Sequence, residues 1–142
     1  MNVESRSNLA KLLATEDISV EHKNIPTAYF NTKDRVLGLP IWKDASKDVY
    51  DLLVGHEVGH ALYTPTTDFA TLASEIDPEN VPAVRSFINV VEDARVEKKI
   101  KRKFPGLRRN FFQGYTELIE NNFFGTQGRD ADSFSLIDRI NL

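Results

Sequence analysis

The sequence predicts an α+β fold, in which a small antiparallel or mixed sheet near the N-terminus packs on longer helices that follow it. Alternating apolar and polar residues occur in short stretches before residue 40, whereas helical periodicity dominates after residue 46. The chain has 142 residues, of which 41% are hydrophobic and 27% are charged. This length and composition predict a single domain over residues 1–142 with a core of its own.

The N-terminal third predicts one helix and three strands. A short helix is expected over 7–13, and alternation through 18–22 suits a half-buried strand. The stretches 28–30 and 36–39 flank a polar turn and predict a hairpin, with Pro40 ending its second strand.

Helices account for most of the remaining chain. Ser46 is a suitable N-cap for a helix over 47–63 that stops before Pro65. The other expected elements are a loop with one short helix in 66–80, a helix from Pro82 to about Lys103, a helix over 107–122 after the Pro105–Gly106 break, and a last helix capped by Asp132 or Ser133.

Several functional classes are excluded or not favoured by composition. The chain has no cysteine, which excludes disulfides and cysteine-based zinc sites and leaves three histidines and the carboxylates as metal ligands. The N-terminus does not have the pattern of a signal peptide, and no window is apolar enough to span a membrane. We therefore expect a cytoplasmic protein.

The run HEVGH carries the clearest chemical signal. Residues four apart lie on one face of a helix, so His56 and His60 can bind one ion while Glu57 reaches the water that this ion polarises. Both histidines also lie on the apolar stripe of the predicted helix, with Glu57 at its edge. The pattern predicts a zinc site in which Glu57 is the catalytic base.

A catalytic zinc needs a third protein ligand. The predicted helix over 82–103 has an apolar stripe, and Glu92 lies beside it next to Ile88. Asp93 lies nearly opposite the stripe, where solvent or a supporting role is expected. Glu92 is therefore the predicted third ligand, with Asp93 and His22 as alternatives. The members of the stripe are Val84, Phe87, Ile88, Val91 and Ala94.

Four further residues have weaker roles. Arg95 lies on the stripe and either pairs with a carboxylate, binds substrate or extends to the surface. Asn89 and Glu97 could orient the histidines. Tyr115 could donate its hydroxyl to the oxyanion of a tetrahedral intermediate, with core packing as the alternative.

A basic run, KKIKRKFPGLRR at 98–109, has two interpretations. Its cations complement a helix C-terminus as a solvated face, or they contact nucleic acid or an acidic partner. The net charge of −3 and the neighbouring phenylalanines argue against a nucleic-acid partner.

The runs HEVGHALYTP and NVVEDARVEKKIKRKFPGLRRNF together resemble a known family. They are similar to gluzincin-type HExxH metallopeptidases of large tailed phages and bacteria, related to cobaltochelatase-subunit-like proteins with a von Willebrand factor A-like domain after the peptidase domain. The resemblance covers roughly residues 25–125.

This resemblance implies a minimal zincin-like fold, with His56, His60 and a glutamate of the second long helix as zinc ligands. It also implies that the strand over 36–39 lines the cleft and pairs with an extended peptide. One position departs from the pattern: the best-known gluzincins place a carboxylate four residues after the ligand glutamate, and here Val96 stands there. The abrupt end of the sequence suits the N-terminal part of a longer protein that continues into a von Willebrand-like domain.

The expected function is that of a zinc peptidase that hydrolyses a peptide or protein substrate. The alternative is a catalytically silent zinc-binding scaffold or regulatory domain of a larger protein. A third hypothesis is a partner- or nucleic-acid-binding protein that uses the basic run.

Overall fold

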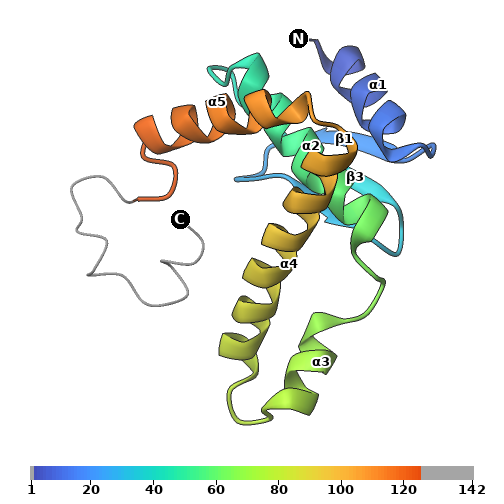
Figure 1. Ribbon diagram of the computed structural model, residues 1–142, viewed down its shortest axis with the longest axis vertical. Coiled ribbons are helices and arrows are strands. Elements are labelled where there is room, and N and C mark those ends of the chain that lie inside the picture. The colour runs from blue at the N-terminus through green and yellow to red at the C-terminus, as the bar shows by residue number, and fades with distance from the viewer. Residues whose placement is uncertain (1, 126–142) are drawn as a thin grey trace.

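The computed structural model describes residues 2–125 (Figure 1). These residues form five helices and a three-stranded sheet, which confirms the predicted α+β class. The elements are α1 (Val3–Ala14), β1 (Ser19–Lys23), β2 (Tyr29–Asn31), β3 (Val36–Pro40), α2 (Lys47–Tyr63), α3 (Phe69–Ile76), α4 (Val81–Lys103) and α5 (Leu107–Glu120). The helix predicted after Asp132 or Ser133 lies outside the described residues.

The sheet is mixed, with the strand order β1-β3-β2. β3 runs parallel to β1 and antiparallel to β2, so the predicted hairpin is confirmed. Because β3 is paired on both sides, its backbone cannot accept an added peptide strand. The expectation that residues 36–39 pair with a substrate is therefore wrong, since strand addition needs an unpaired edge. The edge strands are β1 and β2.

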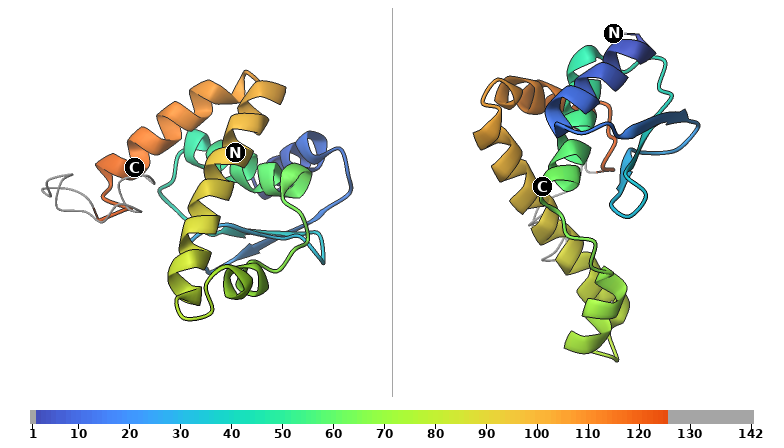
Figure 2. Two further views of the ribbon diagram at one scale, coloured as in Figure 1. Left: turned by 60° about the horizontal axis from the view of Figure 1, so that its bottom comes forward. Right: turned by 90° about the vertical axis from the view of Figure 1, so that its right-hand side faces the viewer.

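α2 forms the central layer of the molecule. The Ser46 hydroxyl caps its start by accepting a hydrogen bond from the Val49 N–H at 3.2 Å, as the sequence predicts. Figure 2 shows the sheet on one side of α2 and the helices α4 and α5 on the other. This double coverage explains why Val54 and Val58 are fully buried and why most of the helix is buried with them.

Tyr50 fastens α2 to the end of the sheet. Its side chain is fully buried, and its hydroxyl donates to the Pro40 carbonyl at 2.8 Å and accepts from the Trp42 N–H at 2.8 Å. One phenol thereby satisfies two backbone groups at the end of β3 and the turn that follows it.

A glycine lets α4 approach α2 closely. A Cβ atom at Gly59 would lie 3.3 Å from the Val96 Cβ and 3.4 Å from the Val96 carbonyl oxygen. Gly59 immediately precedes His60, so this close contact places the middle of α4 beside the histidine. Beyond this contact, α3 pairs with the N-terminal half of α4 and both extend away from the sheet (Figure 1).

The buried face of α4 differs from the predicted one. Phe87 and Val91, both on the predicted apolar stripe, are 40% and 62% exposed, whereas Glu92, Val96 and Ile100 are buried. At about 100° per residue, the three buried positions centre roughly 140° around the helix from the predicted stripe, and Glu92 is the one nearest to it. Contact with α2 determines which face of α4 is buried, and the apolar pattern of the α4 sequence alone does not reveal that contact.

Among the described residues, no helix is both long and apolar enough to cross a membrane.

Candidate metal centre

Two helices bring three potential metal ligands together. His56 and His60 come from α2 and Asp93 from α4, and these form the group of three in the described part of the chain that could hold an ion. The His60 Nε2 lies 3.2 Å from the His56 Nε2 and 3.1 Å from the Asp93 Oδ1. The third separation, from the His56 Nε2 to the Asp93 Oδ1, is 3.7 Å.

These separations fit one small ion. Nitrogen and oxygen ligands at about 2.0–2.1 Å from a tetrahedral zinc are roughly 3.3 Å from one another. The three measured distances scatter around that value. Imidazole nitrogen and carboxylate oxygen are also donor types that zinc accepts in catalytic sites with three protein ligands.

A carboxylate behind His56 fixes its orientation. The His56 Nδ1 lies 2.8 Å from the Glu97 Oε1, and the Tyr115 hydroxyl donates to the same oxygen. Burial raises the pKa of Glu97, but the hydrogen bonds from His56 and Tyr115 outweigh it and leave the pKa below its usual value. An ionised Glu97 only accepts, so in the neutral form of His56 the proton is on Nδ1 and Nε2 presents a lone pair.

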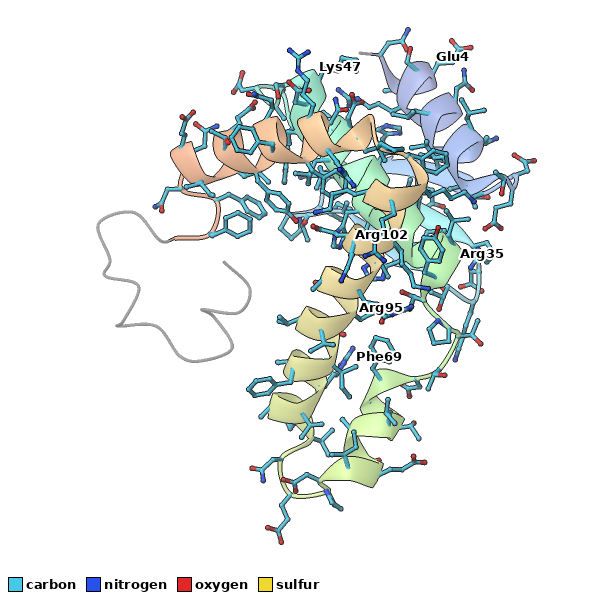
Figure 3. The ribbon with its side chains drawn as sticks, viewed as in Figure 1. Glu4, Arg35, Lys47, Phe69, Arg95 and Arg102 are labelled. Atoms are coloured by element: carbon cyan, nitrogen blue, oxygen red, sulfur yellow. The ribbon has the colours of Figure 1, made fainter. Side chains whose placement is uncertain are left out.

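His60 is held through a hydroxyl. Its Nδ1 lies 2.7 Å from the Thr64 Oγ1, and this hydroxyl is 2.7 Å from the Glu92 Oε1. Arg95 donates to both oxygens of Glu92 at 2.7 Å. This hydrogen bond is the main reason why the pKa of Glu92 is lowered. Figure 3 labels Arg95 on α4, facing the segment that follows α2.

The cluster concentrates negative charge around the two histidines. Burial lowers the pKa of His56, but the hydrogen bond to Glu97 and the charges of Glu57, Glu97 and Asp93 raise it to about 9. Without a cation at its centre, the cluster therefore takes up a proton at neutral pH. A metal ion would also offset the negative charge of these carboxylates, and it would compete with that proton for His56.

The third position of the group is filled by Asp93, the alternative to the predicted Glu92. Glu92 is buried, as expected, but its carboxylate is directed to Thr64 and Arg95 and not to the space between the histidines. The physical reason is the face of α4 that meets α2, which turns Asp93 toward the histidine Nε2 atoms. His22 lies on β1, outside this group.

Glu57 lies in the wall of a cleft that contains the histidines. Its side chain is buried, and this burial raises the pKa of its carboxyl despite the opposing effect of His56 and His60. The cleft has a volume of about 940 Å³ and is bordered by the whole of β2, the loop after α2 and the end of α5. Glu57, the two histidines and Asp93 thus share one solvent-accessible space with an edge strand.

The other predicted residues have distinct positions. Tyr115 borders the cleft, but its hydroxyl is bonded to Glu97 and supports His56 from behind. Arg95 pairs with a carboxylate, one of its three expected roles. Glu97 contacts His56, as one expectation held, whereas Asn89 is exposed on the cleft wall.

Thr64 is the residue of this centre that the sequence analysis missed. It stands four residues after His60, and its N–H donates to the His60 carbonyl at 2.9 Å as the C-cap of α2. This four-residue spacing is the signal that could have identified it, because such pairs meet on one face of a helix. The same spacing relates Asp93 to Glu97.

Part of the basic run borders a second cavity of about 810 Å³ between α4 and α5, where Lys98, Lys101, Arg102 and Arg108 line it together with apolar side chains. Glu97 and Tyr115 form the wall that this cavity shares with the metal centre.

No family model, curated protein or solved structure matches this chain.

Proposed function

We propose that the chain is a zinc-dependent peptidase with a minimal zincin-like fold, in which His56, His60 and Asp93 bind the ion and Glu57 is the catalytic base. The observation that carries the proposal is the mutual spacing of three ligand atoms beside a buried glutamate, all of them in one cleft.

The chemistry follows from the positions of these residues. A zinc ion bound by this group supplies Lewis-acid polarisation of water and of a peptide carbonyl. Glu57 accepts a proton from water as the water oxygen bonds to the carbonyl carbon, and it then returns the proton to the leaving nitrogen as the C–N bond breaks. Because burial raises the pKa of Glu57, its carboxylate is a stronger base than an exposed one.

β2 provides a place for the substrate backbone. It is an edge strand that borders the cleft, and it is antiparallel to β3. An extended peptide that pairs with the open edge of β2 would place its carbonyl groups along the cleft. The peptide-pairing role that the resemblance implied for residues 36–39 is therefore proposed for residues 29–31.

The resemblance to gluzincin-type metallopeptidases supports the proposal, with a shift of one residue. Asp93 replaces the expected glutamate as third ligand, and Glu97, four residues later, supports His56. This shift also explains the departure at Val96: the carboxylate expected four residues after the ligand is Glu97 when the ligand is Asp93.

The test combines metal analysis with proteolysis. The purified chain is expected to hold one zinc per chain by elemental analysis and to cleave members of a random peptide library, as followed by mass spectrometry. Glu57→Gln should keep the zinc and lose cleavage, because it preserves the shape of the side chain and removes the base. Asp68→Asn, at the exposed rim of the same cleft, serves as the matched control and should cleave like the wild type.

The outcomes separate the two hypotheses from each other. A wild-type chain that binds no zinc, or a Glu57→Gln variant that cleaves as fast as its parent, refutes the proposal. Stoichiometric zinc without cleavage of any library member would instead favour the silent zinc-binding scaffold.

A further inference from the structure

Thr64 joins His60, a ligand of the proposed zinc site, to the ion pair between the buried Glu92 and the partly exposed Arg95. We propose that Thr64 is a positioning residue that fixes the tautomer and the orientation of His60, and that the Glu92–Arg95 pair holds Thr64 in place. The inference rests on the proposed zinc site and names further residues on which that site depends.

The direction of the hydrogen bonds follows from proton counting. A threonine hydroxyl has one proton to donate, and an ionised glutamate can only accept. The 2.7 Å contact with the Glu92 Oε1 therefore uses the proton of Thr64. The 2.7 Å contact with His60 must then use a proton on the Nδ1 of the histidine.

This tautomer is the one that metal binding needs. With its proton on Nδ1, His60 presents the lone pair of Nε2, the atom that lies nearest to the His56 Nε2 and the Asp93 Oδ1. The reverse tautomer would place a proton on Nε2, inside the ligand group. It would also leave Thr64 without a donor for its oxygen at this contact.

Glu92 is well suited to anchor the threonine. Arg95 donates to both of its oxygens and also to the Tyr63 carbonyl at 2.5 Å. Arg95 thereby connects α4 with the last residue of α2, immediately before Thr64. The pairing also offsets the Glu92 charge, so His60 is oriented without a further unpaired carboxylate beside Glu57, Glu97 and Asp93.

The two histidines are thus supported by different means. His56 is hydrogen-bonded directly to the carboxylate of Glu97. His60 is hydrogen-bonded to the hydroxyl of Thr64, which in turn donates to the carboxylate of Glu92. Outer partners of metal-bound histidines typically change metal affinity by about 10- to 100-fold when they are removed. We expect Thr64 to fall within that range.

The test measures zinc affinity of the full 142-residue chain by competition with a chromophoric chelator. Thr64→Val keeps the size of the side chain and removes the hydroxyl, so it should weaken zinc binding by about 10- to 100-fold. Thr64→Ser restores the hydroxyl and should return affinity to within about threefold of the wild type. Thr66→Val, at an exposed position of the same segment, is the control and should bind zinc like the wild type.

A spectroscopic measurement distinguishes positioning from general destabilisation. With Co²⁺ in place of zinc, Thr64→Val should shift the visible absorption bands, because the orientation of one imidazole changes, while Thr64→Ser and Thr66→Val should not. A Thr64→Val variant with wild-type zinc affinity and an unchanged Co²⁺ spectrum overturns this inference alone. A wild-type chain that binds no zinc overturns the inference together with the proposed function, whereas zinc binding without proteolysis affects only the latter.

Discussion

Replacing Glu97 by glutamine gives a predicted loss of zinc affinity whose size depends on pH. The carboxylate accepts the Nδ1 proton of His56 at 2.8 Å, and this hydrogen bond is the largest of the effects that raise the pKa of His56 to about 9. Two consequences of the substitution oppose each other. The loss of a charged outer partner weakens zinc binding by about 10- to 100-fold, or roughly 1.4–2.7 kcal/mol.

The opposing effect comes from proton competition. Protonated His56 is favoured below its pKa, so zinc must displace that proton at pH 7, two pH units below 9. This lowers the apparent zinc affinity of the wild type by about 100-fold relative to pH above 9. Glu97→Gln lowers the pKa of His56 and so reduces this penalty. The two effects nearly cancel at pH 7, whereas only the loss remains at pH 9 and above.

The assay is chelator competition for zinc at several pH values between 6.5 and 9.5. The wild type should gain affinity steeply up to about pH 9, and Glu97→Gln should gain less and end about 10- to 100-fold weaker. Lys98→Gln, at the next position on the exposed side of α4, is a suitable control. Equal affinities of Glu97→Gln and wild type at pH 9.5 would refute the assigned role of Glu97.

Three further substitutions test the assembly of the centre and of the fold. Asp93→Asn should reduce zinc affinity, in the same chelator assay, by more than the roughly 100-fold upper bound for outer partners; an unchanged affinity would exclude Asp93 as a ligand. Tyr50→Phe leaves the Pro40 carbonyl and the Trp42 N–H without their partner and should cost about 1–3 kcal/mol in urea unfolding. Gly114→Ala should lower the free energy of unfolding by about 1–3 kcal/mol in the same experiment, because its Cβ would lie 2.9 Å from a carbonyl oxygen of α2. An unchanged free energy of unfolding would show that α5 can move away from α2 without cost.

Local patterns predicted much of this structure. The cap at Ser46 and the helix over 47–63 that carries HEVGH depend on residues within one or two helical turns, and both predictions were confirmed in the fold. The hairpin of β2 and β3 was also predictable, because its polar turn is local. These features depend on backbone preferences that neighbouring residues determine.

Features set by distant contacts were not predictable in the same way. The apolar stripe with Phe87 and Val91 gave the wrong face of α4, because the packing of Val96 against Gly59 orients this helix. Glu92 and Asp93 are neighbours, so the face of α4 that packs on α2 determines which of the two carboxylates points at the histidines. The order of the strands is likewise non-local, so the sequence did not show that β3 is the central strand and β2 an edge of the sheet.

The origin of the ligands on two helices has a consequence for the folding of the chain. His60 and Asp93 are 33 residues apart in sequence, and an ion bound to both closes that stretch into a loop. The chain contains no cysteine, so the ion would serve as a reversible crosslink in place of a disulfide. By analogy with disulfide loops, such a constraint reduces the conformational entropy of the unfolded chain by an equivalent of about 3–4 kcal/mol. Under the proposed function, chelation would therefore remove the catalytic ion and, at the same time, a crosslink between α2 and α4.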